Sequence, residues 1–103
     1  MSDSTDTNIL KRIEAAGRKV LPMHEFLVKN DPKTFDAFDR FLMNSIYRSD
    51  CMSAGHKEML LACVCVAAGS AAPVIENHCR RALAAGLPKD HLLQAMEITA
   101  AVL

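Results

Sequence analysis

The sequence predicts an all-α fold, a small helical bundle within a single domain. Its 103 residues leave room for one domain. Half of the residues are hydrophobic, but only 5% are aromatic and none is Trp, so Ala, Leu, Met and Cys must fill the interior. These residue types favour helices over strands. No stretch alternates apolar and polar side chains convincingly, so we expect no strand.

The first residues are too polar to join a core. Residues 1–6 are polar and acidic, so we expect a disordered tail there and place the domain at residues 7–103. The tail does not have the pattern of a signal peptide. The first helix is expected to begin at residue 7 or 8 and to end at Ala16, before the stop residue Gly17.

Two further helices are expected in the first half of the chain. Pro22 suits the first turn of a helix that runs to about Lys29. Asp31 is a suitable N-cap for the next helix. The apolar side chains of that helix form one stripe, which comprises Phe35, Phe38, Phe41, Leu42 and Ile46. Its polar side chains are expected to face solvent, namely Asp36, Asp39 and Arg40.

The second half is expected to hold three helices. Ser53 is a candidate cap for a helix over residues 56–68, which is apolar on every side and is therefore expected to be central or shared with another subunit. The next helix spans residues 73–86, with Pro first and Gly last. Pro88 and Asp90 start the last helix, whose inward side chains are Leu92, Leu93, Met96, Thr99, Ala100 and Leu103.

The chain ends inside an apolar helical pattern, at residues 101–103, without a polar cap. Such an end exposes apolar surface unless something covers it. We therefore expect an obligate homo-oligomer, and a truncated chain is the alternative.

Charge and cysteine content narrow the classes of partner. Twelve Lys and Arg residues balance twelve Asp and Glu residues, so there is no electrostatic reason to expect nucleic acid or an anionic membrane as a partner. The longest apolar stretch, residues 59–75, is interrupted by Gly and Pro, so we expect no membrane span. Without a secretory signal, a cytoplasmic protein with reduced thiols is expected, at Cys51, Cys63, Cys65 and Cys79.

The strongest candidate for chemistry is His78. It shares the apolar stripe of its helix with Ile75 and Ala82, so it is expected to face inward. Burial favours the neutral ring, and a neutral imidazole in a pocket is a natural general base. A core histidine that is bonded to a carbonyl is the alternative interpretation.

Glu58 is the second candidate. It lies near the start of the apolar helix, where the helix N-terminus favours a carboxylate, and this position alone explains its presence. It also shares a helix face with Cys65, so it can point along a buried surface. A carboxylate close to His78 would orient the ring and hold its tautomer.

The cysteines are accessory candidates. Cys65 and Cys79 would be reactive thiolates if a nearby cation or helix terminus lowered the pKa, and inert small hydrophobes otherwise. A zinc site would need the ligands His56, His78, Cys63 and Cys79, which lack the usual close pairs. There is no Gly-rich phosphate loop either. We therefore expect no metal and no cofactor.

Several segments together resemble the carboxymuconolactone decarboxylase / alkyl hydroperoxidase D-like family. They are Lys57-Glu58 with the apolar helix that follows, Ala67-Ala68-Gly69, His78, residues 81–86 and residues 94–97. The resemblance covers roughly Ile9 to Leu103. It implies an all-helical fold that assembles into trimers, hexamers or similar rings, with the site near subunit contacts.

In the hydroperoxidase D-like branch, a C-x-x-C-x-x-x-H motif carries out thiol–disulfide chemistry with a glutamate on the preceding helix. His78 matches the histidine of this motif and Glu58 matches the glutamate. Ala71 and Val74 stand at the two cysteine positions, so the peroxidase relay lacks both thiols. Cys79 does not replace them, because it points about 100° away from His78 on the helix.

The decarboxylase branch works without the cysteine pair and removes carbon dioxide from an unsaturated lactone acid. A histidine that protonates the incipient carbanion suits this reaction, with Arg81 either as a donor to the lactone oxygen or as a solvated residue. The main hypothesis is therefore a decarboxylase-like enzyme that uses His78 and Glu58 on a small organic acid or lactone. The alternatives are a thiol-dependent peroxidase or reductase built on Cys65 or Cys79, and a non-catalytic oligomeric subunit.

Overall fold

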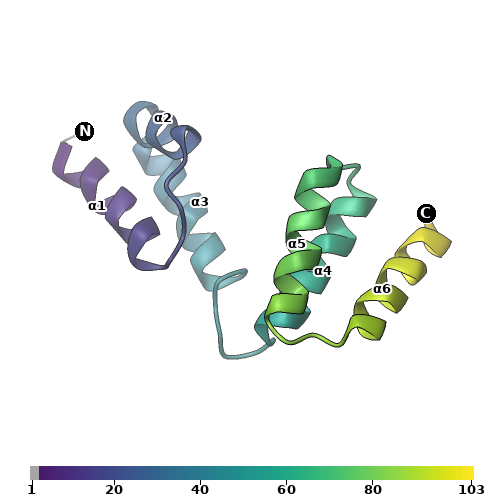
Figure 1. The fold of residues 1–103 in the computed structure, drawn as a ribbon. Helices are drawn as coiled ribbons and strands as arrows, with labels where there is room; N and C mark the ends of the chain where they lie inside the picture. The colour runs from purple at the N-terminus through teal and green to yellow at the C-terminus, as the bar shows by residue number, and fades with distance from the viewer. Residues whose placement is uncertain (1–2) are drawn as a thin grey trace. The chain divides into compact units, whose positions relative to one another are not determined.

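A computed structural model describes residues 3–103, with side chains from residue 8 onward. These residues form six helices and no strand, which confirms the all-α prediction (Figure 1). The helices are α1 (Asp3–Ala15), α2 (Pro22–Asn30), α3 (Pro32–Asn44), α4 (Ala54–Ala67), α5 (Ala72–Ala84) and α6 (Lys89–Val102).

The chain divides into two compact units, residues 1–48 with α1 to α3 and residues 49–103 with α4 to α6. Each unit has its own core, and the two are described separately below. That residues 7–103 form one domain stays a prediction.

The first helix begins earlier than the sequence pattern indicated. α1 starts at Asp3, so residues 3–6 are helical where a tail was expected, while Met1 and Ser2 lie outside the described residues. Acidic and hydroxyl-bearing residues are favoured in the first turn of a helix, where they interact well with the positive end of its dipole. A polar composition therefore did not prevent a helix here.

The other helix ends follow the local signals that the sequence carries. The Asp31 carboxylate accepts a hydrogen bond from the Thr34 backbone N–H at 3.3 Å, and the Ser53 hydroxyl accepts one from the His56 backbone N–H at 3.2 Å. Gly86 has φ of 96°, a left-handed conformation that lets the Leu87 N–H reach the Ala82 carbonyl at 3.1 Å. Both predicted caps and the predicted glycine stop are confirmed.

In the first unit, Ile9, Ile13, Val28 and Phe35 form the buried core. The expected stripe on α3 is wrong at Phe38 and Phe41, which are 55% and 67% exposed, and Ile46 lies past the end of the helix. Leu42 is half-buried. The buried face of α3 is instead the one that Phe35 shares with Asp39, four residues further on.

The prediction that Asp39 faces solvent is wrong. Its side chain is fully buried, and each carboxylate oxygen accepts from an arginine. Arg12 Nη2 lies 3.2 Å from Oδ2, and Arg18 Nη1 lies 2.8 Å from Oδ1. Two guanidinium groups offset the cost of removing this carboxylate from water. The pairing of distant residues therefore decides which face of α3 is buried.

Arg12 also contacts Asp36, which is only partly buried. Its Nη2 lies 2.7 Å from Asp36 Oδ1, although no N–H is well aligned on that oxygen, so the contact is chiefly ionic. The contact with Arg12 holds the pKa of Asp36 below its ordinary value of 3.8; burial opposes this effect, and Arg40 adds to it.

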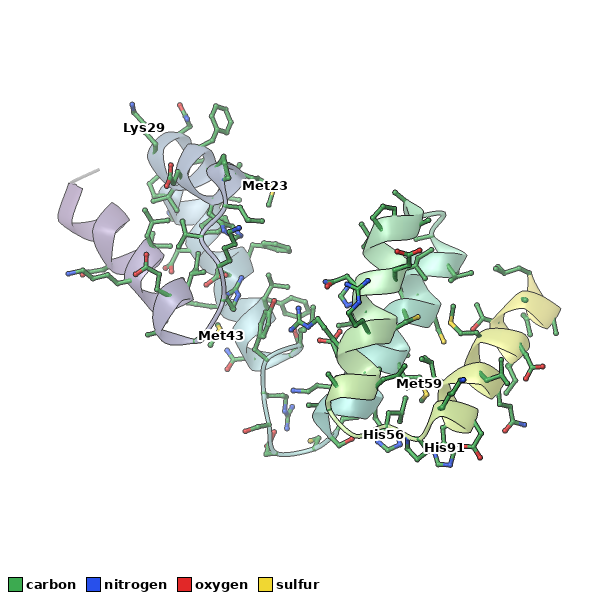
Figure 2. The ribbon with its side chains drawn as sticks, viewed as in Figure 1. Met23, Lys29, Met43, His56, Met59 and His91 are labelled. Atoms are coloured by element: carbon green, nitrogen blue, oxygen red, sulfur yellow. The ribbon has the colours of Figure 1, made fainter. Side chains whose placement is uncertain are left out.

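In the second unit, α4 packs most extensively against α5 and also contacts α6. Ala62 and Ala82 are fully buried, and these small side chains let the two helices approach closely. A Cβ atom on Gly55 would lie only 3.2 Å from Leu87 Cβ, so a glycine fits best at this contact. Met59 packs against the buried cluster of Ala82, Leu87 and Leu92, as do Cys79 and Met96. Figure 2 shows Met59 on the side of α4 and α5 that faces α6.

The apolar helix α4 is covered on only part of its circumference within this unit. Ala62 is buried, whereas Leu60 and Val64 are 51% and 54% exposed. Within residues 3–103, no helix has the length and apolar character that crossing a membrane would require.

Replacement of Asp39 by Asn should lower the free energy of unfolding by about 3 kcal/mol, because Arg12 and Arg18 then lose the buried charge that pairs them. Urea denaturation followed by circular dichroism measures this loss. Asp36→Asn is the matched control, since its partly exposed carboxylate shares Arg12, and we expect a loss below about 1 kcal/mol. Equal losses in the two variants would contradict the structural role of Asp39.

Candidate functional site

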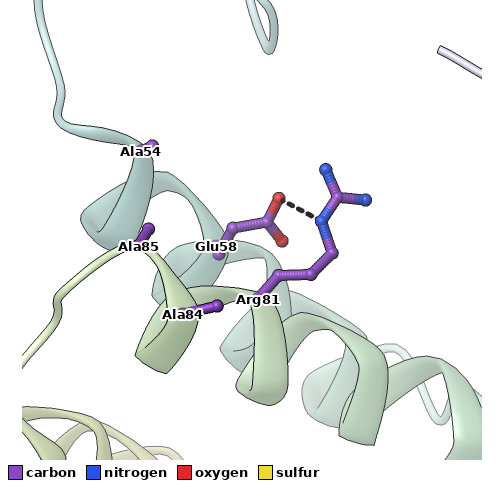
Figure 3. A pocket seen from close by; sticks show the side chains of 5 residues that line it. All are labelled: Ala54, Glu58, Arg81, Ala84 and Ala85. Carbon is purple, nitrogen blue, oxygen red and sulfur yellow. Dashed lines mark ion pairs between the residues drawn. The ribbon is translucent and has the colours of Figure 1, made fainter. Parts of the chain in front are cut away.

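The candidate site is centred on the carboxylate of Glu58, which α4 presents to α5. The Glu58 side chain is only 13% exposed, and both of its oxygens have partners. Oε2 lies 2.7 Å from His78 Nδ1, and Oε1 lies 3.2 Å from Arg81 Nε (Figure 3). One carboxylate therefore bridges two side chains of the neighbouring helix.

Helix periodicity explains why both partners reach the same carboxylate. His78 and Arg81 are three residues apart on α5, which places them next to each other on the helix surface. Ala82, four residues after His78, is fully buried and keeps α5 close to α4. On α4, Glu58 precedes the buried Ala62 by the same interval, so its side chain lies beside the contact between the two helices.

Hydrogen-bond chemistry assigns the proton between Glu58 and His78. An ionised carboxylate can only accept, so the Nδ1 atom of His78 must donate to Oε2. This arrangement leaves Nε2 as the ring nitrogen through which a proton can be exchanged with a substrate. The His78 side chain is 19% exposed, which is sufficient for limited access from solvent.

A hollow of about 340 Å³ lies next to this pair. Glu58 and Arg81 line it together with the methyl groups of Ala54, Ala84 and Ala85 (Figure 3). It thus offers one ion pair and an otherwise apolar surface. His78 does not line the hollow, but it is hydrogen-bonded to Glu58, which does.

The structure brings together the two residues that the sequence proposed as catalytic. The imidazole of His78 bonds to the carboxylate of Glu58 rather than to a backbone carbonyl. The predicted closeness of the two groups is confirmed, whereas their catalytic role stays a prediction.

Arg81 has a second role that helical phase alone did not reveal. Its side chain is 58% exposed, as expected for a residue on the wet face, yet its Nε pairs with Glu58. The available signal was the spacing of three residues between His78 and Arg81, because residues at this spacing are neighbours on the surface of a helix. The sequence contained no signal for the three alanines of the hollow.

The cysteines stand apart from this site. Cys79 packs into the core of the second unit, where burial raises the pKa of its thiol above the ordinary 9.0; the neighbouring Cys63 and Glu76 add to this effect. Cys65 is half-buried, and in the described part of the chain it makes no polar contact with Glu58 or His78. Each of the four cysteines is a thiol.

No metal centre is found within the described residues, where no three His, Cys, Asp or Glu side chains are grouped to hold an ion. His56, one of the zinc ligands considered above, instead has its Nδ1 atom 2.6 Å from the Ser53 hydroxyl.

Comparison with protein-family models, curated proteins and solved structures finds no match to this chain. The family resemblance accordingly stays an interpretation of the sequence, and the geometry around Glu58 is the direct evidence about function.

Removal of the Glu58 carboxylate should change the tautomer of His78. In the wild-type chain the neutral ring should carry its proton on Nδ1, because Glu58 accepts there, whereas in Glu58→Ala the proton should move to Nε2, which free imidazoles prefer. The ¹⁵N shifts of the two ring nitrogens report the tautomer when they are measured at a pH high enough to give the neutral ring. Glu76→Ala, which removes an exposed carboxylate from the same helix, is the control. A neutral wild-type ring that carries its single proton on Nε2 would refute the assignment.

Proposed function

We propose that this chain is an acid–base enzyme of the carboxymuconolactone decarboxylase-like type, acting on a small organic acid or lactone. The observation that carries the proposal is the contact of 2.7 Å between His78 Nδ1 and Glu58 Oε2, made by largely buried side chains beside a hollow. Acid–base pairs use this arrangement, in which a carboxylate orients an imidazole and stabilises its charged form.

The step that this pair suits is protonation of a carbanion. When the carbon–carbon bond to a carboxylate breaks, carbon dioxide leaves and the electron pair passes into a conjugated carbonyl or lactone group of the substrate. The protonated ring of His78 then donates its Nε2 proton to carbon and becomes neutral. Glu58 offsets the charge of the imidazolium before the transfer. The reaction therefore consumes one proton, which His78 supplies, and needs no oxidant or reductant.

The thiol-dependent alternative is less well supported. A nucleophilic cysteine needs a lowered pKa, and burial raises that of Cys79. The two positions before His78 at which the hydroperoxidase D-like motif has cysteines are occupied by Ala71 and Val74, which carry no thiol. A non-catalytic subunit is the other alternative, and it differs from the proposal in requiring no reaction at His78.

We also propose that the protein is a homo-oligomer, as the family resemblance implies. Each helix of the second unit leaves large apolar side chains exposed: Leu60 and Val64 on α4, Val74 and Leu83 on α5, and Leu93, Ile98 and Val102 on α6. Leu60 and Val64 are four residues apart and share one helix face. Exposed apolar surface of this kind is typical of association sites.

The oligomer proposal predicts that Leu60→Glu combined with Val64→Glu dissociates the assembly, because two charges then have to be buried without partners. Light scattering coupled to gel filtration measures the molar mass of the wild-type protein and of the variant. Gln94→Glu, at an exposed polar position, should leave the mass unchanged. A wild-type mass equal to that of one chain would refute the proposal.

The enzymatic proposal predicts release of carbon dioxide from γ-carboxymuconolactone or from one of a small panel of unsaturated and β-keto acids. His78→Gln should slow the release by about 100-fold or more, because it removes the proton donor. His56→Gln, which changes an exposed histidine on α4, is the matched control and should retain the activity. Release that is equally fast in His78→Gln would exclude acid–base catalysis by this residue, and no release from any acid would favour the non-catalytic subunit.

A further inference from the structure

Only one of the three nitrogens of the Arg81 guanidinium group is paired with another side chain of the described residues. Its Nε atom pairs with Glu58, and this is its only polar contact with the side chains of residues 8–103. Figure 3 shows the two terminal nitrogens at the far end of the group from this contact. The Arg81 side chain as a whole is 58% exposed and is one of those that line the hollow, so its unpaired N–H donors are accessible to a ligand there.

The contact with Glu58 prepares this group for a ligand. An unattached arginine side chain loses rotamer freedom when it binds, whereas the contact at Nε already restrains Arg81. The two terminal nitrogens then form a planar pair of donors, which matches the two oxygens of a carboxylate.

The surroundings of Arg81 select the kind of molecule that fits. The hollow of about 340 Å³ is at the small end of ligand pockets, and apart from the ion pair it is lined by the methyl groups of three alanines. Ala54 begins α4, whose positive dipole end favours an anion, but Ala84 and Ala85 end α5, whose carbonyl end opposes it. The two dipoles offset each other, so the ion pair decides the sign of the ligand. Within the described part of the chain, both oxygens of Glu58 already have partners, whereas the terminal nitrogens of Arg81 do not, so a ligand meets donors that suit an anion.

We propose that Arg81 is the anchor for a carboxylate, so that the hollow binds a small carboxylic acid with an apolar body. The carboxylate lies on the terminal nitrogens of Arg81, and the apolar body of the acid covers Ala54, Ala84 and Ala85. This assignment deepens the proposed function, since the acid is then held beside the pair of Glu58 and His78, but binding itself requires no reaction.

The test uses two probes of the same shape, sorbate and its neutral amide, with the full-length chain. Titrations followed by ¹H–¹⁵N NMR should show that sorbate shifts the backbone signals of Ala54, Ala84 and Ala85. The amide should bind at least about tenfold more weakly, since it lacks the charge that Arg81 pairs with. Absence of a saturable shift at about 10 mM sorbate, or equal binding of the two probes, would overturn the proposal.

Variants separate an anchor from a residue that merely positions Glu58. Arg81→Gln should weaken sorbate binding by at least about tenfold, while Arg80→Gln, which removes the adjacent exposed arginine, should leave it unchanged. Glu58→Gln should maintain or strengthen binding, because it removes the negative charge nearest to Arg81. If Arg81 only positioned Glu58, both site variants would weaken binding, and that result would refute the anchor.

The binding test and the reaction test can fail separately. Sorbate binding that depends on Arg81, without carbon dioxide release from any acid, would keep the anchor and remove the decarboxylase proposal. Carbon dioxide release that is unaffected in rate and KM by Arg81→Gln would keep the enzyme and remove the anchor. The NMR spectrum of each variant also shows whether the chain remains folded.

Discussion

The close packing of α4 against α5 is the constraint on which the candidate site depends. The side chains of Ala62 and Ala82 are small enough for the two helices to approach. Because Gly55 has no Cβ atom, Leu87 in the turn after α5 can pack against the start of α4. At this separation a glutamate on one helix reaches a histidine on the other without solvent between them. Larger residues at the contact would separate the helices, and Glu58 would become an ordinary surface carboxylate.

Two carboxylates, the fully buried Asp39 in the first unit and the largely buried Glu58 in the second, show how the partners of a charge determine what it can do. Asp39 is held by two arginines, which remain charged at every physiological pH, so the arrangement is purely structural. Glu58 has one arginine and one imidazole, and an imidazole, unlike a guanidinium, is a side chain that can take part in proton transfer. The second arrangement also borders a hollow, whereas the carboxylate of the first is completely enclosed.

The acid–base proposal and the anchor proposal assign different tasks to the two partners of Glu58. His78 donates a hydrogen bond through Nδ1 and keeps Nε2 for proton exchange. Arg81 makes an ion pair through Nε and keeps its terminal nitrogens for a ligand. Each side chain is thus restrained at one atom and available at another, which is the kind of preorganisation that binding and catalysis require. The thiols have no comparable arrangement, since the one nearest in sequence to His78 packs into the core.

The sequence by itself determined the helices, because the signals that start and stop them act over three or four residues. Asp31, Ser53 and Gly86 therefore have the roles that their local context indicated, and Glu58 was recognised beside His78 through the family resemblance and helical phase together. Only the tertiary structure decided which faces are buried. The burial of Asp39, the exposure of Phe38 and the pairing of Arg81 with Glu58 all depend on groups that are more than one helical turn away along the chain. Local periodicity can identify an apolar face, but the burial of a charge is settled by the opposite charge that a distant segment brings to it.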